Sequence, residues 1–154
     1  LHAPGHVLQV VSAENTVASS ATSSSAVNII SVNITPKSNT SKIYVTASIN
    51  ATTAAGSRAG VGLYKGSSPV VRGDAAGNRS RVYSQVQNGD TGIFSSIAMT
   101  YLDSPATTSQ ITYSAKMEPE GGSTVFYINS SASDTDSSSR FRGVSNITVM
   151  EIAQ

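Results

Sequence analysis

Apolar and polar residues alternate along much of this chain. The alternation is clearest in 43–49, and it recurs in 93–102 and 111–117. A period of two places successive side chains on opposite faces of a β-strand, so each segment predicts a strand with one buried face. The expected inward residues are Ile43, Val45, Ala47 and Ile49, then Ile93, Ile97, Met99 and Tyr101, then Ile111, Tyr113, Ala115 and Met117.

Shorter runs of the same kind bring the expected total to about eight to ten strands. They lie at 7–11, 27–34, 60–64, 82–86, 125–128 and 147–152. Turn-forming Gly, Pro, Asn and Asp residues separate the runs, and no segment has the period of a long amphipathic helix. We therefore predict an all-β fold, an antiparallel jelly-roll sandwich. The small, polar stretches 12–25 and 50–58 are predicted to be surface loops.

The length of 154 residues predicts one domain, with 7–154 as the folded unit and 1–6 as a linker stub from a longer protein. The chain has no Cys, which excludes disulfides, thiolate metal sites and Cys nucleophiles. Only 12% of the residues are charged, about half the usual fraction. Because Ser and Thr are abundant, we expect a neutral, hydroxyl-rich surface, which suits hydrogen bonding to sugars.

The net charge of +1 argues against a nucleic-acid partner. Binding to a phosphate backbone needs several cations on one face, and no cluster exceeds the spaced Arg72, Arg79 and Arg81. No apolar run approaches the roughly 20 residues that span a bilayer, and no basic segment precedes an apolar one as in a signal peptide. We expect no membrane insertion by this domain.

Groups suited to catalysis are few. His2 and His6 are the only imidazoles, both lie in the expected linker, and no Gly-x-Ser-x-Gly motif occurs. The chain is therefore predicted not to be an enzyme.

Two carboxylate pairs leave alternatives open. Glu118/Glu120 and Asp134/Asp136 have the spacing of possible Ca²⁺ ligands, and a polysaccharide depolymerase would also use paired carboxylates. Both pairs lie in predicted loops, and no aromatic platform accompanies them. Glu118 and Glu120 flank Pro119 just before two glycines, which favours an ordinary turn. The Asp134/Asp136 pair lacks the glycine and the later glutamate of a calcium loop. We therefore predict ordinary solvated turns, with no metal and no cofactor, and a depolymerase is the least favoured function.

Tyrosines and sequons are the remaining candidate features. The Tyr side chains of the more apolar second half, Tyr101, Tyr113 and Tyr127, are the expected subunit-interface residues. Asn-x-Ser/Thr triplets are expected by chance in a chain so rich in Ser and Thr, although they leave open a glycosylated, secreted eukaryotic trimer. They begin at Asn33, Asn39, Asn50, Asn78, Asn129 and Asn146.

The order of several short motifs resembles the C-terminal domains of bacteriophage tail-fibre and tail-needle proteins. The motifs are Pro-Gly-His-Val-Leu-Gln-Val-Val at 4–11, Ile-Thr-Pro-Lys-Ser at 34–38 with Ser-Lys-Ile-Tyr-Val at 41–45, Tyr-Leu-Asp-Ser-Pro at 101–105 with Ile-Thr-Tyr at 111–113, and Ile-Thr-Val-Met-Glu-Ile at 147–152. The resemblance implies a tumour-necrosis-factor-like jelly roll, assembled as a homotrimeric knob on an upstream shaft at the tip of a virion fibre or needle.

The resemblance also implies contact with a host surface, through a glycan or an outer-membrane receptor, where three copies would multiply weak contacts. The alternative is a structural cap that only trimerises the fibre. The arginines of the polar loops could engage acidic sugars or subunit carboxylates, or could be plain solvated charges. The expected contact residues, within 50–58, 67–81, 87–92 and 130–140, are Asn50, Arg58, Arg72, Arg79, Arg81, Asn88, Asp90, Asp134, Asp136 and Arg140.

Overall fold

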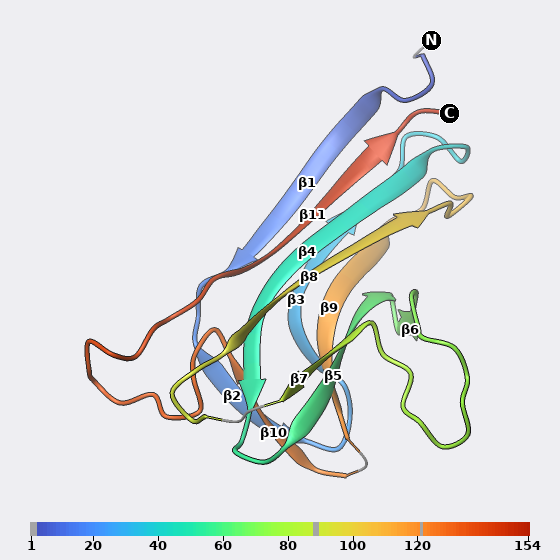
Figure 1. Cartoon of the computed structure of the whole chain (residues 1–154). Coiled ribbons are helices and arrows are strands. Elements are labelled where there is room, and N and C mark those ends of the chain that lie inside the picture. The colour runs from blue at the N-terminus through green and yellow to red at the C-terminus, as the bar shows by residue number, and fades with distance from the viewer. Residues whose placement is uncertain (1–2, 88–89, 121) are drawn as a thin grey trace.

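Two antiparallel sheets pack face to face in the computed structural model, which describes residues 3–87, 90–120 and 122–154 (Figure 1). The described part of the chain is all-β, as predicted. Its strands are β1 (Val7–Asn15), β2 (Ser19–Ser23), β3 (Val27–Ile34), β4 (Lys42–Thr53), β5 (Arg58–Lys65), β6 (Ser68–Pro69), β7 (Ser84–Gln87), β8 (Ser95–Asp103), β9 (Ile111–Pro119), β10 (Thr124–Ile128) and β11 (Ser145–Ile152).

The strand pairing is that of a jelly roll. In the six-stranded sheet, called sheet A here, the order is β1-β11-β4-β10-β2, and β8 pairs with the other edge of β4. In the five-stranded sheet B the order is β3-β9-β5-β6, and β7 also pairs with β5. The pairs β1–β11, β3–β9, β4–β8 and β5–β7 are nested, so strands early in the chain meet strands late in the chain.

The core lies between the two sheets and contains most of the residues that the alternation placed inward. All of the inward residues expected in 43–49 and 111–117 are buried. Ile97 and Met99 of β8 are buried too, and Tyr101 packs partly buried against the same core. Ile93 is the exception, because it precedes β8 in a loop and its side chain is 54% exposed.

Two predicted loops contain strand. β1 continues to Asn15 and β2 occupies 19–23, within the stretch expected to be irregular, and β4 continues to Thr53. The side chains of β2 are only Ser, Thr and Ala, so its sequence carries no apolar alternation. Its extended form comes from main-chain pairing with β10, where Ala21 lies opposite Phe126.

The two chain ends lie together at one end of the sandwich, called the proximal end here (Figure 1). The Gly5 amide donates to the Ala153 carbonyl and the Ala153 amide donates to the His6 carbonyl, both over 2.8 Å. The connections 35–41 and 104–110 share the proximal end. The β4–β5 and β9–β10 turns and the long β10–β11 connection lie at the opposite, distal end.

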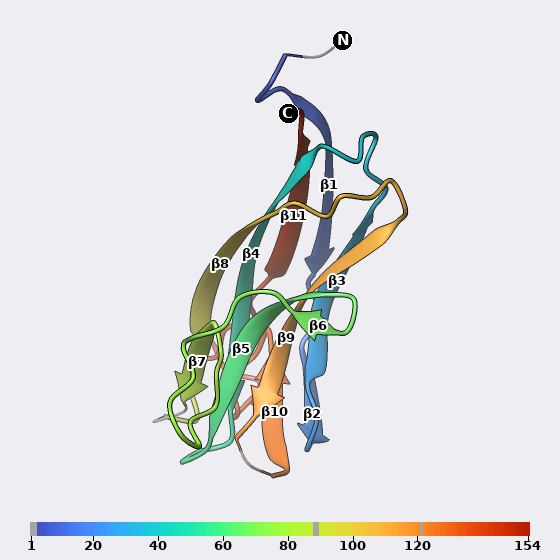
Figure 2. The ribbon, with the colours of Figure 1, turned by 90° about the vertical axis from the view of Figure 1, so that its right-hand side faces the viewer.

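The connection between β6 and β7 stands out beside β5, as both views of the ribbon show (Figure 2). The Val70 amide donates to the Leu63 carbonyl of β5 over 3.0 Å, and the Tyr83 amide donates to the Val61 carbonyl over 3.0 Å. Each end of this connection is thus fixed to sheet B, and the residues between them form a projecting loop.

Candidate functional site

The outer face of sheet A carries an apolar row near the proximal end. Val10 lies opposite Met150, Met150 opposite Tyr44, and Tyr44 opposite Leu102. The next row toward the distal end consists of hydroxyl side chains, in the order Ser12, Thr148, Thr46 and Thr100. Neither row contains a charged residue, so burying these two rows against another protein would desolvate no ion.

The predicted interface tyrosines lie in different surroundings. Tyr113 is 1% exposed inside the sandwich, so it is a core residue, and its assignment to an interface was wrong. Its position in β9 alternates with Thr112 and Ser114 and therefore faces inward with Ala115. Tyr101 is partly buried against the core. Tyr127 of β10 is half-buried, and its interface role stays a prediction.

A buried carboxylate explains why the tyrosines face inward. Asp103 Oδ2 accepts hydrogen bonds from the Tyr113 hydroxyl over 2.6 Å and from Lys65 Nζ over 2.9 Å, and Asp103 Oδ1 accepts one from the Tyr101 hydroxyl over 3.3 Å. Burial alone would raise the pKa of Asp103, but the hydrogen bonds from Tyr113, Lys65 and Tyr101 lower it below its usual range. Burial, followed by the neighbouring carboxylate, raises the pKa of Tyr113. The group is thus an ionised carboxylate held by protonated phenols and an ammonium.

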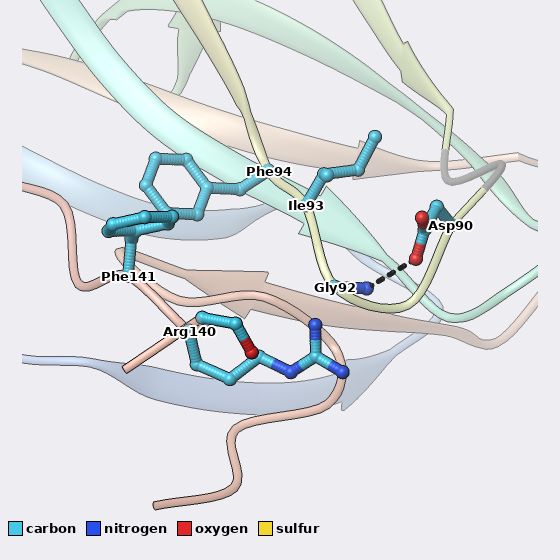
Figure 3. A pocket seen from close by; sticks show the side chains of 7 residues that line it. Asp90, Gly92, Ile93, Phe94, Arg140 and Phe141 are labelled. Atoms are coloured by element: carbon cyan, nitrogen blue, oxygen red, sulfur yellow. Dashed lines mark hydrogen bonds between the residues drawn. The ribbon is translucent and has the colours of Figure 1, made fainter. Parts of the chain in front are cut away.

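A pocket of about 340 Å³, called the distal pocket here, lies between the end of the β7–β8 connection and the β10–β11 connection (Figure 3). The rings of Phe94 and Phe141 lie close together at one side, and the Arg140 guanidinium faces Gly92 and Asp90 at the other. Phe141 is 66% exposed. A large apolar side chain this exposed, next to a cation, is typical of a recognition surface.

A larger hollow of about 730 Å³, called the side groove here, lies between sheet B and the projecting β6–β7 connection. Its side chains are mostly polar or charged and come from β5, the connection, β7 and the end of β9. Arg58, the first residue of β5 after the β4–β5 turn, lines the groove, so one end of the groove lies near the distal end of the sandwich. The lining residues are Arg58, Ala59, Gly60, Asn78, Arg79, Ser80, Val82, Gln85, Glu118, Pro119 and Glu120.

Arg72 fixes the inner wall of the side groove. Its Nη1 lies 2.5 Å from Glu118 Oε2 and also donates to the Arg81 carbonyl, while its Nη2 donates to the Tyr64 hydroxyl over 3.1 Å. The Tyr64 ring lies between two cations, with Lys116 Nζ 4.6 Å from its centroid. Arg72 therefore ties the projecting connection to β5 and β9.

The predicted contact residues on the β5 and β6–β7 segments gather around the side groove. Arg58 and Arg79 line it, and Arg72 is buried behind it as a structural residue. Arg81 donates from Nε to the Gly73 carbonyl over 2.6 Å within the connection. Two segments, β5 and the β6–β7 connection, thus bring their arginines to one region.

The other predicted contact residues lie at the distal end. Asp90 and Arg140 line the distal pocket. Asp134 forms an ion pair with Arg142, with 2.6 Å between Oδ2 and Nη2, and Asp136 is exposed in the same loop. Asn50 donates from Nδ2 to the Val144 carbonyl over 2.7 Å, so its side chain supports the loop. Asn88 lies outside the described residues.

The carboxylate pairs carry separate ion pairs. Glu118 binds Arg72, and Glu120 Oε2 lies 3.3 Å from Arg58 Nε on the surface. Among the described residues no group of three or more His, Cys, Asp or Glu side chains is placed to hold a metal ion. His6 is exposed, and His2 lies outside the described part of the chain. In that same part, no helix has the length and apolar character needed to cross a membrane.

Sequence reasoning missed the two features that give the sites their character. Phe141 was not singled out, although a Phe within the polar stretch 130–143 has no apolar neighbours in sequence with which to form a strand face. Glu118 was placed in a solvated turn, but β9 continues through it and its side chain is mostly buried. No sequence signal indicated that the β6–β7 connection would lie beside it.

No protein-family model matches this chain, and no curated protein matches it at a significant level.

Proposed function

We propose that this domain is the trimeric tip of a bacteriophage fibre or needle and that it contacts the host-cell surface during adsorption or penetration. The main support for the proposal is that the chain ends and the distal pocket lie at opposite ends of the molecule. Both chain ends lie at the proximal end, while the distal pocket and the end of the side groove at Arg58 lie toward the distal end. A shaft joined at the proximal end would leave the distal pocket on the side away from the virion.

The outer face of sheet A supports the trimeric part of the proposal. Its apolar and hydroxyl rows are uncharged, whereas the outer side of sheet B carries the Arg72–Glu118 pair and the projecting connection. Packing three copies through sheet A would bury Val10 and Leu102, which are largely exposed in the single chain. The motif resemblance to phage fibre and needle proteins points to the same assembly.

A purely structural cap is the second candidate, because the sheet A face supports trimerisation without any receptor. The two functions differ in what the distal end does. A cap needs only the sheet A face, and substitutions in the distal pocket or side groove would leave its role intact. A receptor-binding tip needs the distal end as well.

Two measurements test the proposal. Light scattering of the isolated domain should give three times the 15.8 kDa mass of one chain, and a monomeric mass would contradict it. The fluorescently labelled domain should bind intact host bacteria in a saturable manner and should compete with whole virions for adsorption. A stable trimer that neither binds host cells nor slows adsorption would leave the structural cap as the better explanation.

A further inference from the structure

We propose that the side groove binds an acidic saccharide, through a ligand carboxylate at Arg79 and ligand hydroxyls at the amide and hydroxyl side chains of the lining. This inference rests on the proposed contact with the host surface and gives that contact a site and a ligand chemistry. The ligand class follows from the cation and the polar side chains that line the groove.

Glu118 forms part of the groove wall. Its Oε2 is bound by Arg72, and its Oε1 is buried next to Gly62. We therefore treat this carboxylate as a structural group that holds the wall in place, and we assign it no contact with the ligand.

Arg79 supplies the anion-binding group. Its guanidinium donates one long hydrogen bond, 3.3 Å from Nη1 to the Ala76 carbonyl, and no carboxylate of the described residues pairs with it. The other groove arginine, Arg58, already has Glu120. Because a guanidinium binds a carboxylate through two parallel hydrogen bonds, Arg79 is the point where an anionic ligand group would be held.

The rest of the lining fits a saccharide better than an apolar ligand. Asn78, Ser80 and Gln85 add amide and hydroxyl groups, which donate to and accept from the hydroxyls of a sugar. At Gly60 the Val82 side chain packs directly over the backbone of β5, because a Cβ at this position would collide with Val82 Cγ1. The volume of about 730 Å³ is in the range of small-molecule binding sites.

The side groove stays accessible in the proposed assembly. It lies beside the outer side of sheet B, whereas the uncharged rows proposed for packing copies belong to sheet A on the other side of the sandwich. Three grooves on one trimer would face outward around the axis. Weak single-site binding to a repeating bacterial polysaccharide would therefore be strengthened by avidity.

The test is titration calorimetry of the trimer with a panel of oligosaccharides of equal length, comprising hexuronates, sialylated chains and neutral chains. We expect at least one acidic member to bind and neutral members of the same backbone to bind more weakly. Arg79→Gln should weaken the acidic ligand about tenfold, the loss expected for one charge-assisted contact. Ser80→Trp, which fills the groove, should abolish binding. Arg142→Gln removes the same charge from the β10–β11 loop and should bind as the native protein does.

The outcomes separate this inference from the proposed function. Binding to none of the acidic members, or native affinity in both Arg79→Gln and Ser80→Trp, would overturn the groove assignment. If these variants also bind host cells normally, the proposed function stands and its receptor contact lies elsewhere, with the distal pocket next to be tested. If the native domain binds no host cells at all, the proposed function fails whatever the calorimetry shows. A thermal unfolding midpoint equal to that of the native protein confirms that each variant is folded.

Discussion

Ser145 donates a hydrogen bond from Oγ to Asn129 Oδ1 over 2.7 Å, and both residues are completely buried. Asn129 Nδ2 donates to the Asn15 carbonyl over 2.7 Å and to the Val17 carbonyl over 3.2 Å. One amide side chain therefore joins the end of β10, the start of β11 and the break between β1 and β2. Asn129 adopts a φ of 58°, a left-handed conformation that Asn tolerates better than most residues.

Replacing Asn129 with Ala should destabilise the fold. The change removes three hydrogen bonds, leaves buried polar groups unpaired and keeps the unfavourable φ, so we expect a loss of at least about 2 kcal/mol in the free energy of unfolding. Urea denaturation measures it. Asn78→Ala, at an exposed sequon in the projecting connection, is the matched control and should change stability by less than about 0.5 kcal/mol. Equal effects at the two sites would contradict the role given to Asn129.

Tyr113→Phe tests the buried carboxylate. The substitution deletes only the hydroxyl that binds Asp103 Oδ2 at 2.6 Å, and it leaves the ring in the core. Hydrogen bonds to charged groups contribute about 1.5–3 kcal/mol, and we expect a loss of that size in the free energy of unfolding. Tyr83→Phe removes a partly exposed hydroxyl that accepts from the Thr100 amide, and it should cost less. If Tyr113→Phe leaves the free energy of unfolding unchanged, the hydrogen bonds from Lys65 and Tyr101 are enough to stabilise the buried Asp103 carboxylate.

How far the sequence predicts the fold depends on whether a strand buries one face. The stretch 43–49 was predicted correctly because the residues that it buries are apolar and alternate with polar ones in the sequence. β2 was missed because its pairing with β10 uses main-chain groups, which every sequence has. Tyr113 shares its face with Ala115, so periodicity alone indicated burial, and only its residue type suggested an interface. Its partner Asp103 lies in another strand, and sequence separation does not reveal that contact.

The sequence predicted which loops carry candidate contact residues, but it did not predict how these loops come together. Arg58 and the arginines of 67–81 were singled out, but nothing predicted that they would line one groove together with Glu118 from β9. These segments meet because β5 pairs with β9 and the connection folds back onto β5. Such placement follows from topology, and single-sequence patterns carry no signal for it.

Acid should destabilise the domain partly through Glu151. Burial alone would raise the pKa of this carboxyl, but the Ser41 side chain, Gln9 Nε2 and the Lys37 and Ser38 amides lower it. An unfolded Glu has a pKa of about 4.3. Because the folded pKa is lower, the unfolded chain takes up the proton first, and the stabilisation present above that value is lost as the pH falls through the folded pKa.

Urea unfolding between about pH 7 and pH 3 measures this contribution. Glu151→Gln should be less stable than the native protein at neutral pH and should lose less stability on acidification. Glu14→Gln, at a carboxyl exposed on β1, is the control. An unchanged dependence on pH in Glu151→Gln would show that other carboxyls, such as Asp103, account for the acid response.

Leu102→Glu should break the proposed trimer without unfolding the chain. Leu102 is 49% exposed in the apolar row of sheet A, so a glutamate there is tolerated in the monomer. In the trimer each of the three subunits would bury one such carboxylate at the interface. Light scattering should show a shift toward monomer. Ser31→Glu places the same charge on the outer face of β3 in sheet B and should remain trimeric. A trimeric Leu102→Glu protein would place the subunit interface elsewhere.

Phe141→Ser should weaken binding to host cells. Phe141 carries the most exposed aromatic ring at the distal end, where it lies against Phe94 and near Arg140 (Figure 3). Removing an exposed ring costs the fold little, whereas a ring buried by a receptor contributes heavily to affinity. We expect at least a tenfold rise in the concentration needed for half-maximal binding of the labelled domain to cells, equal to about 1.4 kcal/mol.

Val17→Ser is the matched control, because Val17 is equally exposed at 67% but lies at the break between β1 and β2, outside the distal pocket. Loss of cell binding in Phe141→Ser alone would assign the contact to the distal pocket. Equal loss in both variants would indicate nonspecific apolar adhesion, because a specific receptor distinguishes positions and adhesion responds to total exposed apolar area. Unchanged binding in Phe141→Ser, with reduced binding in Arg79→Gln, would make the side groove the principal receptor contact.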